Sequence, residues 1–476
     1  IKAGQPLVDP KTGLHYYTSG YDYTKMNKGY RGFQGDFMSN GIITPGREWT
    51  AKLTEVKYVY RYVDFDKLDG HTLTLRNKYC FTDIANLFYL KYTVLANGSV
   101  IETGNLVLPP CAPGQSAFIN IPYKDVADDG KEYVVTLSLC LKNATTWAER
   151  GYEMLAQQFA INAAGGVAKS VADPTFVQQP RAALPAVTAK GKLKVKGNTV
   201  TGENFSLAFD ADGSIANWTY NGTQIVEPST GPDYCGFRSI ANDNVSLGAT
   251  GGVAKNDNLV GGVITGKKTL VKAPRKVGKN VVVETAVANS VDTHAIRYTI
   301  YPDGTVDMRI AFNNSNADNR RVGVTMQFAP GMEKVDYYAK GPWSNYIDRQ
   351  RGSLLGLYHT TVDGMFEELS APQTMGDRQG LRYLQLTGNG IKLGVQTEGQ
   401  LAFSLSHIDD AQLDYDVFYG GKHPYDLVRK PQIFAHFDFW QRGIGNRSCG
   451  GDSCLPQYLT PTGEHVVMLR FKPAAE

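Results

Sequence analysis

Short runs of alternating apolar and polar residues, interrupted by glycine-containing turns, recur along most of this chain. The clearest case surrounds the dipeptide Asp303-Gly304, which is typical of a two-residue hairpin turn. Apolar residues alternate on both sides of it, with a period of two that places one face of each strand in a core. The pattern predicts a half-buried antiparallel hairpin with these inward residues: Ile296, Tyr298, Ile300, Val306, Met308 and Ile310.

The same turn signal occurs at Asn97-Gly98, Asp212-Gly213 and Asn221-Gly222, within a chain that holds 50 glycines and 22 prolines. We therefore expect a mainly β fold. Strand texture over 66–162 has the size of one small sandwich, and the stretch rich in Ala, Gly and Pro over 163–191 is expected to be a linker. The strands over 192–476 are enough for one very large sandwich or two small ones.

Helical spacing is found in two places. Leu53, Val56, Tyr60 and Val63 recur at the period of an amphipathic helix that starts near Thr50 and runs for about three to four turns. A second, shorter helix is predicted over residues 147–159.

Composition narrows the class of protein. The 476 residues are 42% hydrophobic and 20% charged, with 49 basic against 46 acidic side chains and a net charge of +3. This balance is typical of a folded chain of two to four domains, and it gives no electrostatic argument for nucleic acid or an anionic membrane. No apolar run of about 18 residues is present, so no membrane span is predicted. Because the chain begins at Ile1 rather than Met, we expect a fragment of a longer protein whose compartment is left open.

Short motifs for catalysis or metal binding are weak. The eight histidines show no H-x-H or H-x-x-x-H spacing, and the six cysteines form no C-x-x-C pair, so structural histidines are expected and structural zinc is not. Gly451-Asp452-Ser453 is expected to be a turn, and Gly443-Ile444-Gly445 does not open a helix as a dinucleotide site would. The basic stretch over 267–279 alternates with Val and Leu and is expected to be a solvated strand face.

Aromatic side chains near glycines and amides are typical of sugar sites, where rings stack on sugar C–H faces. Core packing is the alternative, and the residues alone favour it. Glycoside cleavage also needs two carboxylates at a set separation, which a single sequence cannot pair. The aromatic residues in question are Tyr16, Tyr17, Tyr21, Tyr23, Phe33, Phe37, Trp343, Tyr346, Phe437, Phe439 and Trp440.

A series of motifs in order resembles glycoside hydrolase family 2 β-galactosidases over nearly the whole chain. Gly20-Tyr-Asp-Tyr, the segment Gly35-Asp-Phe-Met-Ser-Asn-Gly-Ile and Glu55 in a helix look like the end of the catalytic (β/α)8 barrel. Residues 1–65 would then be a barrel remnant. Residues 66–162 resemble the immunoglobulin-like domain that follows the barrel, including the run Asn143-Ala-Thr-Thr-Trp-Ala-Glu-Arg-Gly.

From residue 192 the chain is similar to the large terminal domain known as the β-galactosidase small chain. The resemblance thus implies an immunoglobulin-like sandwich and a terminal β-supersandwich, preceded by a barrel remnant with one helix. Four motifs carry it: Phe237–Asp243, Gly341–Arg349, Pro372–Arg378 and the run from Gly443 through Ser453.

Three positions depart from the family pattern. Ser344 and Thr374 stand where the family usually has glutamate, and Cys454 stands where it has the tryptophan that lines the sugar site. These changes leave the sugar specificity open. Cys449 and Cys454 can be two thiols or a small disulfide loop, and two thiols are favoured.

The resemblance implies the C-terminal part of a retaining exo-β-galactosidase whose partner is a β-galactoside, with homo-oligomerisation left open. The two catalytic glutamates and the Mg²⁺ ligands of the family precede the segment at which this chain starts, so no catalytic residue is expected here. Asn40 aligns with the asparagine that contacts the galactose 6-hydroxyl and a site Na⁺, and Phe37 aligns with the phenylalanine whose carbonyl helps to bind that Na⁺. Asn40-Gly41 alone would indicate a tight turn. The alternatives are a family 2 enzyme for another β-linked sugar, and a non-catalytic carbohydrate-binding or scaffold protein.

Overall fold

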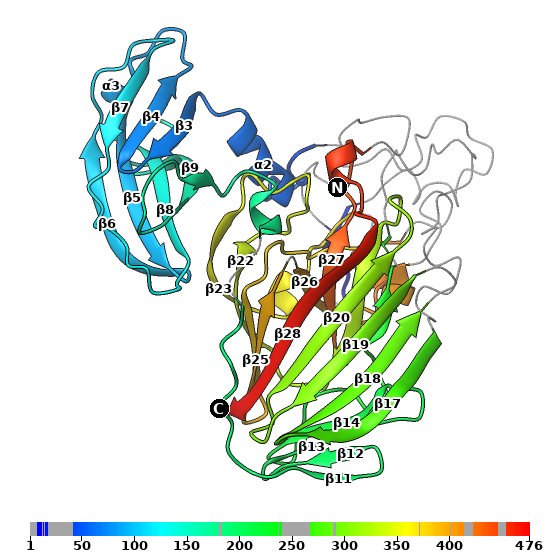
Figure 1. The fold of residues 1–476 in the computed structure, drawn as a ribbon. Coiled ribbons are helices and arrows are strands. Elements are labelled where there is room, and N and C mark those ends of the chain that lie inside the picture. The colour runs from blue at the N-terminus through cyan, green and yellow to red at the C-terminus, as the bar shows by residue number, and fades with distance from the viewer. Residues whose placement is uncertain are drawn as a thin grey trace, which may run out of the picture.

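The computed structural model shows a mainly β protein built from two bodies, which confirms the predicted fold class (Figure 1). Helices are confined to short segments among the described residues. The structure describes residues 7–11, 13, 15–17, 41–179, 183–236, 238–239, 267–288, 292–370, 372–399, 401–413, 422–445 and 454–476.

The first body is a sandwich of a three-stranded sheet, β3-β4-β7, and a five-stranded sheet, β10-β9-β8-β5-β6. Residues along β4 alternate between buried and partly or fully exposed positions, so one face of that sheet closes over a core that includes Phe65, Leu75, Leu90 and Leu137. The strands are β3 (Val63–Asp69), β4 (Thr72–Asn77), β5 (Phe88–Ala96), β6 (Ser99–Val107), β7 (Ser116–Asn120), β8 (Tyr133–Leu141), β9 (Glu153–Ile161) and β10 (Lys169–Ser170).

The second body packs a four-stranded sheet, β16-β21-β27-β26, against a nine-stranded sheet, β17-β18-β19-β20-β28-β25-β24-β22-β23. Every residue of β27 is buried, which places this strand in the interior of the body. The strands of the four-stranded sheet are β16 (Asp233–Cys235), β21 (Arg321–Phe328), β26 (Ala402–Ser406) and β27 (Ile433–Gln441).

The nine-stranded sheet runs through the whole second body, and a smaller five-stranded sheet, β11 to β15, lies at its lower end (Figure 1). The strands of the nine-stranded sheet are β17 (Lys267–Val277), β18 (Asn280–Ala288), β19 (Thr293–Ile300), β20 (Val306–Asn314), β22 (Lys334–Gly341), β23 (Leu354–Thr361), β24 (Tyr383–Gly388), β25 (Ile391–Glu398) and β28 (Gly463–Ala475). The smaller sheet consists of β11 (Lys194–Lys196), β12 (Thr199–Thr201), β13 (Phe205–Phe209), β14 (Ile215–Tyr220) and β15 (Thr223–Gln224).

All four predicted hairpins form, and the two-residue turn is confirmed at Asn97-Gly98 and Asn221-Gly222. At Asp212-Gly213 and Asp303-Gly304 the turn instead holds three residues. In β19–β20, Tyr298 pairs with Met308, and both are buried together with the other predicted inward residues. Asn97 and Asn221 both have a φ of 47°, the left-handed conformation that an Asn-Gly turn requires. The basic stretch is also confirmed as a solvated strand, because β17 is largely exposed at the edge of its sheet.

The helix predictions need correction. Helix α2 (Ala51–Val59) begins as predicted, with the Thr50 hydroxyl accepting a hydrogen bond from the Leu53 amide, but it ends early. The Tyr60 amide closes the last turn on Val56, and Val63 is instead the buried first residue of β3. The helix predicted over 147–159 is wrong: its second half belongs to β9, where the period of two that buries alternate side chains prevails over a coincidental helical spacing.

Side-chain hydrogen bonds join the two bodies. The Gln158 side chain accepts a hydrogen bond from the Leu355 amide at 2.7 Å and donates one to the Leu355 carbonyl at 2.8 Å. Glu132 on the first body accepts from Arg382 at 2.8 Å and from Tyr338 at 2.7 Å on the second. These bonds fix β22 and β23, and hence the segment between them, against the first body. No helix in the described part of the chain combines the length and apolar character needed to cross a membrane.

Candidate functional site

Segments that carry the four predicted motifs converge at one end of the second body. The buried Arg238 guanidinium donates to the carbonyl oxygens of Arg442 and Gly443, the latter at 3.3 Å. Burial lowers the pKa of Arg238 to about 10, with the neighbouring Arg320 acting in the same direction. A buried guanidinium with two backbone acceptors fixes the path of the chain as it leaves β27.

A second contact ties two more motifs together. The Ser239 amide donates to the Thr374 hydroxyl at 2.9 Å, and the Thr374 amide donates back to the Ser239 carbonyl at 3.2 Å. The Tyr346 hydroxyl donates to the Thr374 carbonyl at 3.4 Å. Thr374 therefore joins three of the four motifs through hydrogen bonds. We call Arg238, Ser239, Tyr346, Asp348, Thr374, Gly443 and Cys454 the motif cluster.

Asp348 closes the motif cluster on the segment after β27. Its carboxylate accepts hydrogen bonds from the amides of Ile444 and Gly445, both at 3.0 Å. The Gly443 amide donates to the Tyr458 carbonyl at 2.9 Å, which closes the two ends of this loop on each other. The loop is thus anchored by a charged group as well as by backbone bonds.

Cys454 is half-buried and packs on the main core next to this anchor. Burial, and then the charge of Asp348, raise the pKa of its thiol. A Cβ built on Gly443 would lie 2.7 Å from the Cys454 sulfur and 2.7 Å from the Asp348 carboxylate. Glycine at 443 is therefore required for the close approach of these two side chains.

The segment Gly341–Arg349 is held by its own asparagine. The buried Asn345 side chain donates to the Lys340 carbonyl at 3.1 Å and accepts from the Gln379 amide at 3.0 Å. Ser344 is also buried; its amide donates to the Glu367 carboxylate at 3.2 Å. A carboxylate from another segment therefore contacts the backbone at Ser344.

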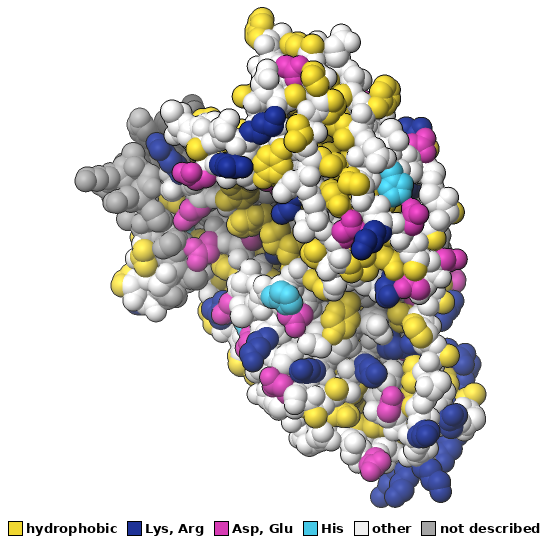
Figure 2. Space-filling model, turned by 90° about the vertical axis from the view of Figure 1, so that its left-hand side faces the viewer, with side chains coloured by type: hydrophobic (Ala, Val, Ile, Leu, Met, Phe, Trp, Pro, Cys, Tyr) yellow, Lys and Arg dark blue, Asp and Glu magenta, His cyan; other side chains and the backbone are white. Residues whose placement is uncertain are grey.

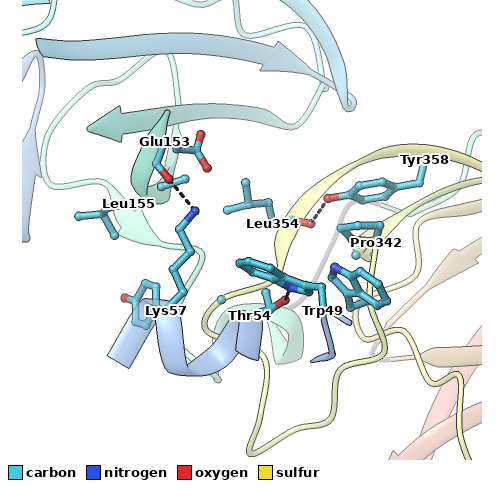
Figure 3. A pocket seen from close by; sticks show the side chains of 13 residues that line it. Trp49, Thr54, Lys57, Glu153, Leu155, Pro342, Leu354 and Tyr358 are labelled. Atoms are coloured by element: carbon cyan, nitrogen blue, oxygen red, sulfur yellow. Dashed lines mark hydrogen bonds between the residues drawn. The ribbon is translucent and has the colours of Figure 1, made fainter. Parts of the chain in front are cut away.

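The start of the same segment lines a pocket of about 190 Å³ at the junction of the two bodies (Figure 3). Helix α2, β9 and β23 supply the other walls. Figure 2 shows hydrophobic side chains in a hollow where the upper and lower bodies meet. The lining residues are Trp49, Thr54, Lys57, Tyr58, Glu153, Leu155, Ala156, Gly341, Pro342, Trp343, Gly352, Leu354 and Tyr358.

Two tryptophans give the pocket an aromatic character. Trp49 is 41% exposed and Trp343 is 37% exposed, while the Trp49 indole N–H donates to the Thr54 hydroxyl at 2.8 Å. Lys57 donates to the Glu153 carbonyl at 2.6 Å across the pocket (Figure 3). Partly exposed rings beside fixed polar groups are chemically suited to a sugar or another flat polar ligand.

The sequence-predicted residues have different outcomes. Phe37, Asn40 and Cys449 lie outside the described residues, whereas Cys454 belongs to the motif cluster. Core packing is confirmed for four of the aromatic residues, which are buried, and Trp343 is instead partly exposed at the pocket. The sequence pattern did not single out Trp49. Its only local indication is its position directly before Thr50, the residue that caps helix α2. The buried aromatics are Tyr346, Phe437, Phe439 and Trp440.

Comparisons with known proteins agree with the predicted resemblance. The family described as beta galactosidase small chain matches residues 201–471, and the one described as beta-galactosidase, domain 4, matches residues 73–162. The chain belongs to the β-galactosidase small-chain family. Together the matched domains correspond to the C-terminal portion of a β-galactosidase, which confirms the assignment made from the motifs.

The curated relatives reported below are also β-galactosidases. The chain is 26% identical to a β-galactosidase of Priestia megaterium over 89% of its own length and 40% of the relative. It is 25% identical to a β-galactosidase of Vibrio vulnificus over 98% of its length and 44% of the relative. The chain thus spans about two fifths of the relatives it matches. Galactose 1-epimerase of Lactobacillus acidophilus overlaps 58% of this chain and 93% of its own, at 10% identity and a TM-score of 0.34, a likeness that supports no further argument.

Proposed function

We propose that this chain is the C-terminal part of a retaining exo-β-galactosidase, and that it shapes the rim of the substrate site. In such an enzyme one carboxylate attacks the anomeric carbon while the other protonates the leaving oxygen, and water then releases the sugar. Both carboxylates are expected outside this chain. Membership of the small-chain family and the β-galactosidase names of the relatives support this proposal.

The anchoring of the loop after β27 is the observation that carries the rim role. Arg238 and Asp348 fix the backbone of Gly443–Gly445 from two directions, so charged side chains hold the start of the loop in place. Because Cys454 replaces a family tryptophan, the stacking surface for the leaving sugar is reduced or comes from elsewhere. Trp49 and Trp343 are partly exposed rings that can supply such a surface.

The proposal also includes a Na⁺ site at Asn40 and Phe37. Asn40 offers an amide oxygen and Phe37 a backbone carbonyl, and hard cations prefer oxygen donors of this kind. Na⁺ bound there would help to orient the sugar 6-hydroxyl, and Mg²⁺ is expected in the upstream barrel. Whether the enzyme forms a homo-oligomer is open, and its molar mass in solution decides it.

A family 2 glycosidase for another β-linked sugar is the alternative, because Ser344, Thr374 and Cys454 depart from the family pattern. A panel of nitrophenyl β-glycosides on the full-length enzyme separates the two. We expect the galactoside to have the highest kcat/KM, and a higher value for another sugar would favour the alternative. Absence of turnover on every glycoside would instead favour a binding or scaffold protein.

The rim role has its own test in the full-length enzyme. Cys454→Trp should tighten binding of disaccharides with a glucosyl aglycone by about 1 kcal/mol, the size of one aromatic stack. Deleting the loop tip should alter affinity for the aglycone but leave covalent trapping by an activated fluorogalactoside intact. Unchanged kinetics in both variants would show that the loop does not reach the site.

A further inference from the structure

Three side chains of different chemistry meet inside the second body, and none of them belongs to the motif cluster. The sulfur of Cys235 lies 3.2 Å from Nδ1 of His436, and Nε2 of the same ring lies 3.5 Å from a carboxylate oxygen of Asp410. One ligand atom from each residue lies within 4.8 Å of the other two. A thiol, an imidazole and a carboxylate are thus brought together from three segments far apart in the chain.

Two of these groups lie on strands on either side of β21. Cys235 on β16 and Asp438 on β27 both pair with Gly323 of the intervening strand β21. A Cβ on Gly323 would lie 2.4 Å from the Asp438 carboxylate, so only glycine leaves room over β21. Cys235 and His436 contact each other across this strand, and His436 alternates along β27 with the core residues Ala435 and Phe437.

The charges around the three groups favour a cation. Arg321 is fully buried and forms a bidentate ion pair with Asp438. Its Nε and Nη2 atoms donate to the two carboxylate oxygens at 2.8 and 2.7 Å, and the two charges cancel. Asp410 lies 4.0 Å from the same guanidinium. If Cys235 binds as a thiolate, Cys235 and Asp410 together carry two negative charges that the Arg321–Asp438 pair does not offset.

A further buried carboxylate lies in this region. Burial, and then the charge of Asp438, raise the pKa of Asp377 to about 8. Its Oδ1 atom has no hydrogen-bond partner among the residues that the structure describes. Near neutral pH Asp377 is therefore protonated and adds no negative charge to the region.

We propose that Cys235, His436 and Asp410 form a binding site for one Zn²⁺ ion, which no part of the proposed function requires. Thiolate, imidazole and carboxylate are the three ligand types that zinc takes in proteins. Tetrahedral Zn²⁺ sets its donor atoms about 3.3–3.6 Å apart, so the donors must close by about 1 Å and His436 must use one nitrogen only. Binding releases the thiol proton to solvent, and a water molecule completes the coordination. Asp410, at 16% exposure, provides the side from which the ion enters.

Cobalt provides the direct test, because Co²⁺ takes zinc sites and a cobalt–thiolate bond gives a near-ultraviolet charge-transfer band. The chain is purified, stripped with a chelator, dialysed and titrated with Co²⁺ and then with Zn²⁺. We expect one equivalent of Co²⁺ to produce that band together with the visible bands of tetrahedral cobalt, and Zn²⁺ to abolish both. Absence of the charge-transfer band in the unmutated chain would overturn the proposal.

Variants assign the ligands. Cys235→Ser should lose the charge-transfer band and weaken Zn²⁺ binding about tenfold or more, whereas Asp410→Asn should keep the band and weaken binding to a similar degree. Cys140→Ser is the matched control, because Cys140 is a buried strand cysteine in the first body. Near-ultraviolet circular dichroism verifies the fold of each variant. Unchanged zinc affinity in both ligand variants would overturn the proposal, as would equal loss in the control.

Discussion

Asp348 accepts a hydrogen bond from the backbone amide of Ile444 at 3.0 Å, so the end of one family motif fixes the start of another. The two residues are far apart in sequence and lie on segments that follow different sheets. This bond aligns the loop after β27 with the segment that also lines the junction pocket. The loop after β27 and the pocket are therefore parts of one connected framework.

The close packing around Gly443 predicts a destabilising substitution. Gly443→Ala would place a methyl group 2.7 Å from both Asp348 and Cys454, and this overpacking should cost about 1–3 kcal/mol in the free energy of unfolding. Denaturant unfolding measures it. Gly356→Ala is the control, because the nearest atom to its built Cβ is at 3.5 Å. Equal effects in the two variants would contradict the packing argument.

Catalysis gives a second prediction. The 476-residue chain alone should not hydrolyse nitrophenyl β-galactoside, because the nucleophile and the acid/base glutamate are expected outside it. The assay uses purified chain from a host strain without its own β-galactosidase. Turnover that persists under these conditions would require a catalytic pair within the chain.

Asn40→Ala tests the proposed sugar contact in the complete enzyme. Loss of the amide should weaken galactoside binding by about 1–3 kcal/mol, the range for an unpaired hydrogen-bonding group or ion. Thermal stability should change little if the residue is a ligand contact. Loss of fold and activity together would instead favour a structural turn at Asn40-Gly41.

The fully buried Lys340 predicts a pH dependence of stability. Burial lowers its pKa to about 7 from 10.5, against the charge of Glu55, and the ammonium group donates to the Val171 carbonyl at 2.7 Å. Between these pKa values the unfolded chain binds a proton that the folded chain does not. The free energy of unfolding should therefore rise between pH 7 and 9, by at most about 1.4 kcal/mol per pH unit.

Lys340→Met is the comparison for this prediction, since it removes the titrating group and keeps an apolar chain of similar length. Its free energy of unfolding should rise less over the same pH range. If the two proteins show equal slopes in urea unfolding, Lys340 does not titrate as its burial implies.

The sequence by itself determined the strands and their turns. Asn-Gly and Asp-Gly dipeptides favour turn conformations that few other residues adopt. The alternation around Asp303-Gly304 specified which side chains of that hairpin face the core, Tyr298 and Met308 among them, but not the length of its turn. These signals are local, so the chain carries them without reference to the rest of the fold. Helical spacing was a less reliable signal. Val63 and the residues of β9 have apolar positions compatible with a helix, but they form strands because they pair with neighbouring strands in the folded sheets.

The sites, in contrast, were decided by tertiary structure. The motifs located Asp348, Arg238 and Gly443 along the chain, but nothing in their spacing indicated that they bond to one another. Cys235, Asp410 and His436 share no motif, and they meet only because the fold brings β16, β27 and the segment around Asp410 together. The physical reason is that a sheet pairs segments irrespective of their separation in sequence, so the side chains it brings together have no common local signal.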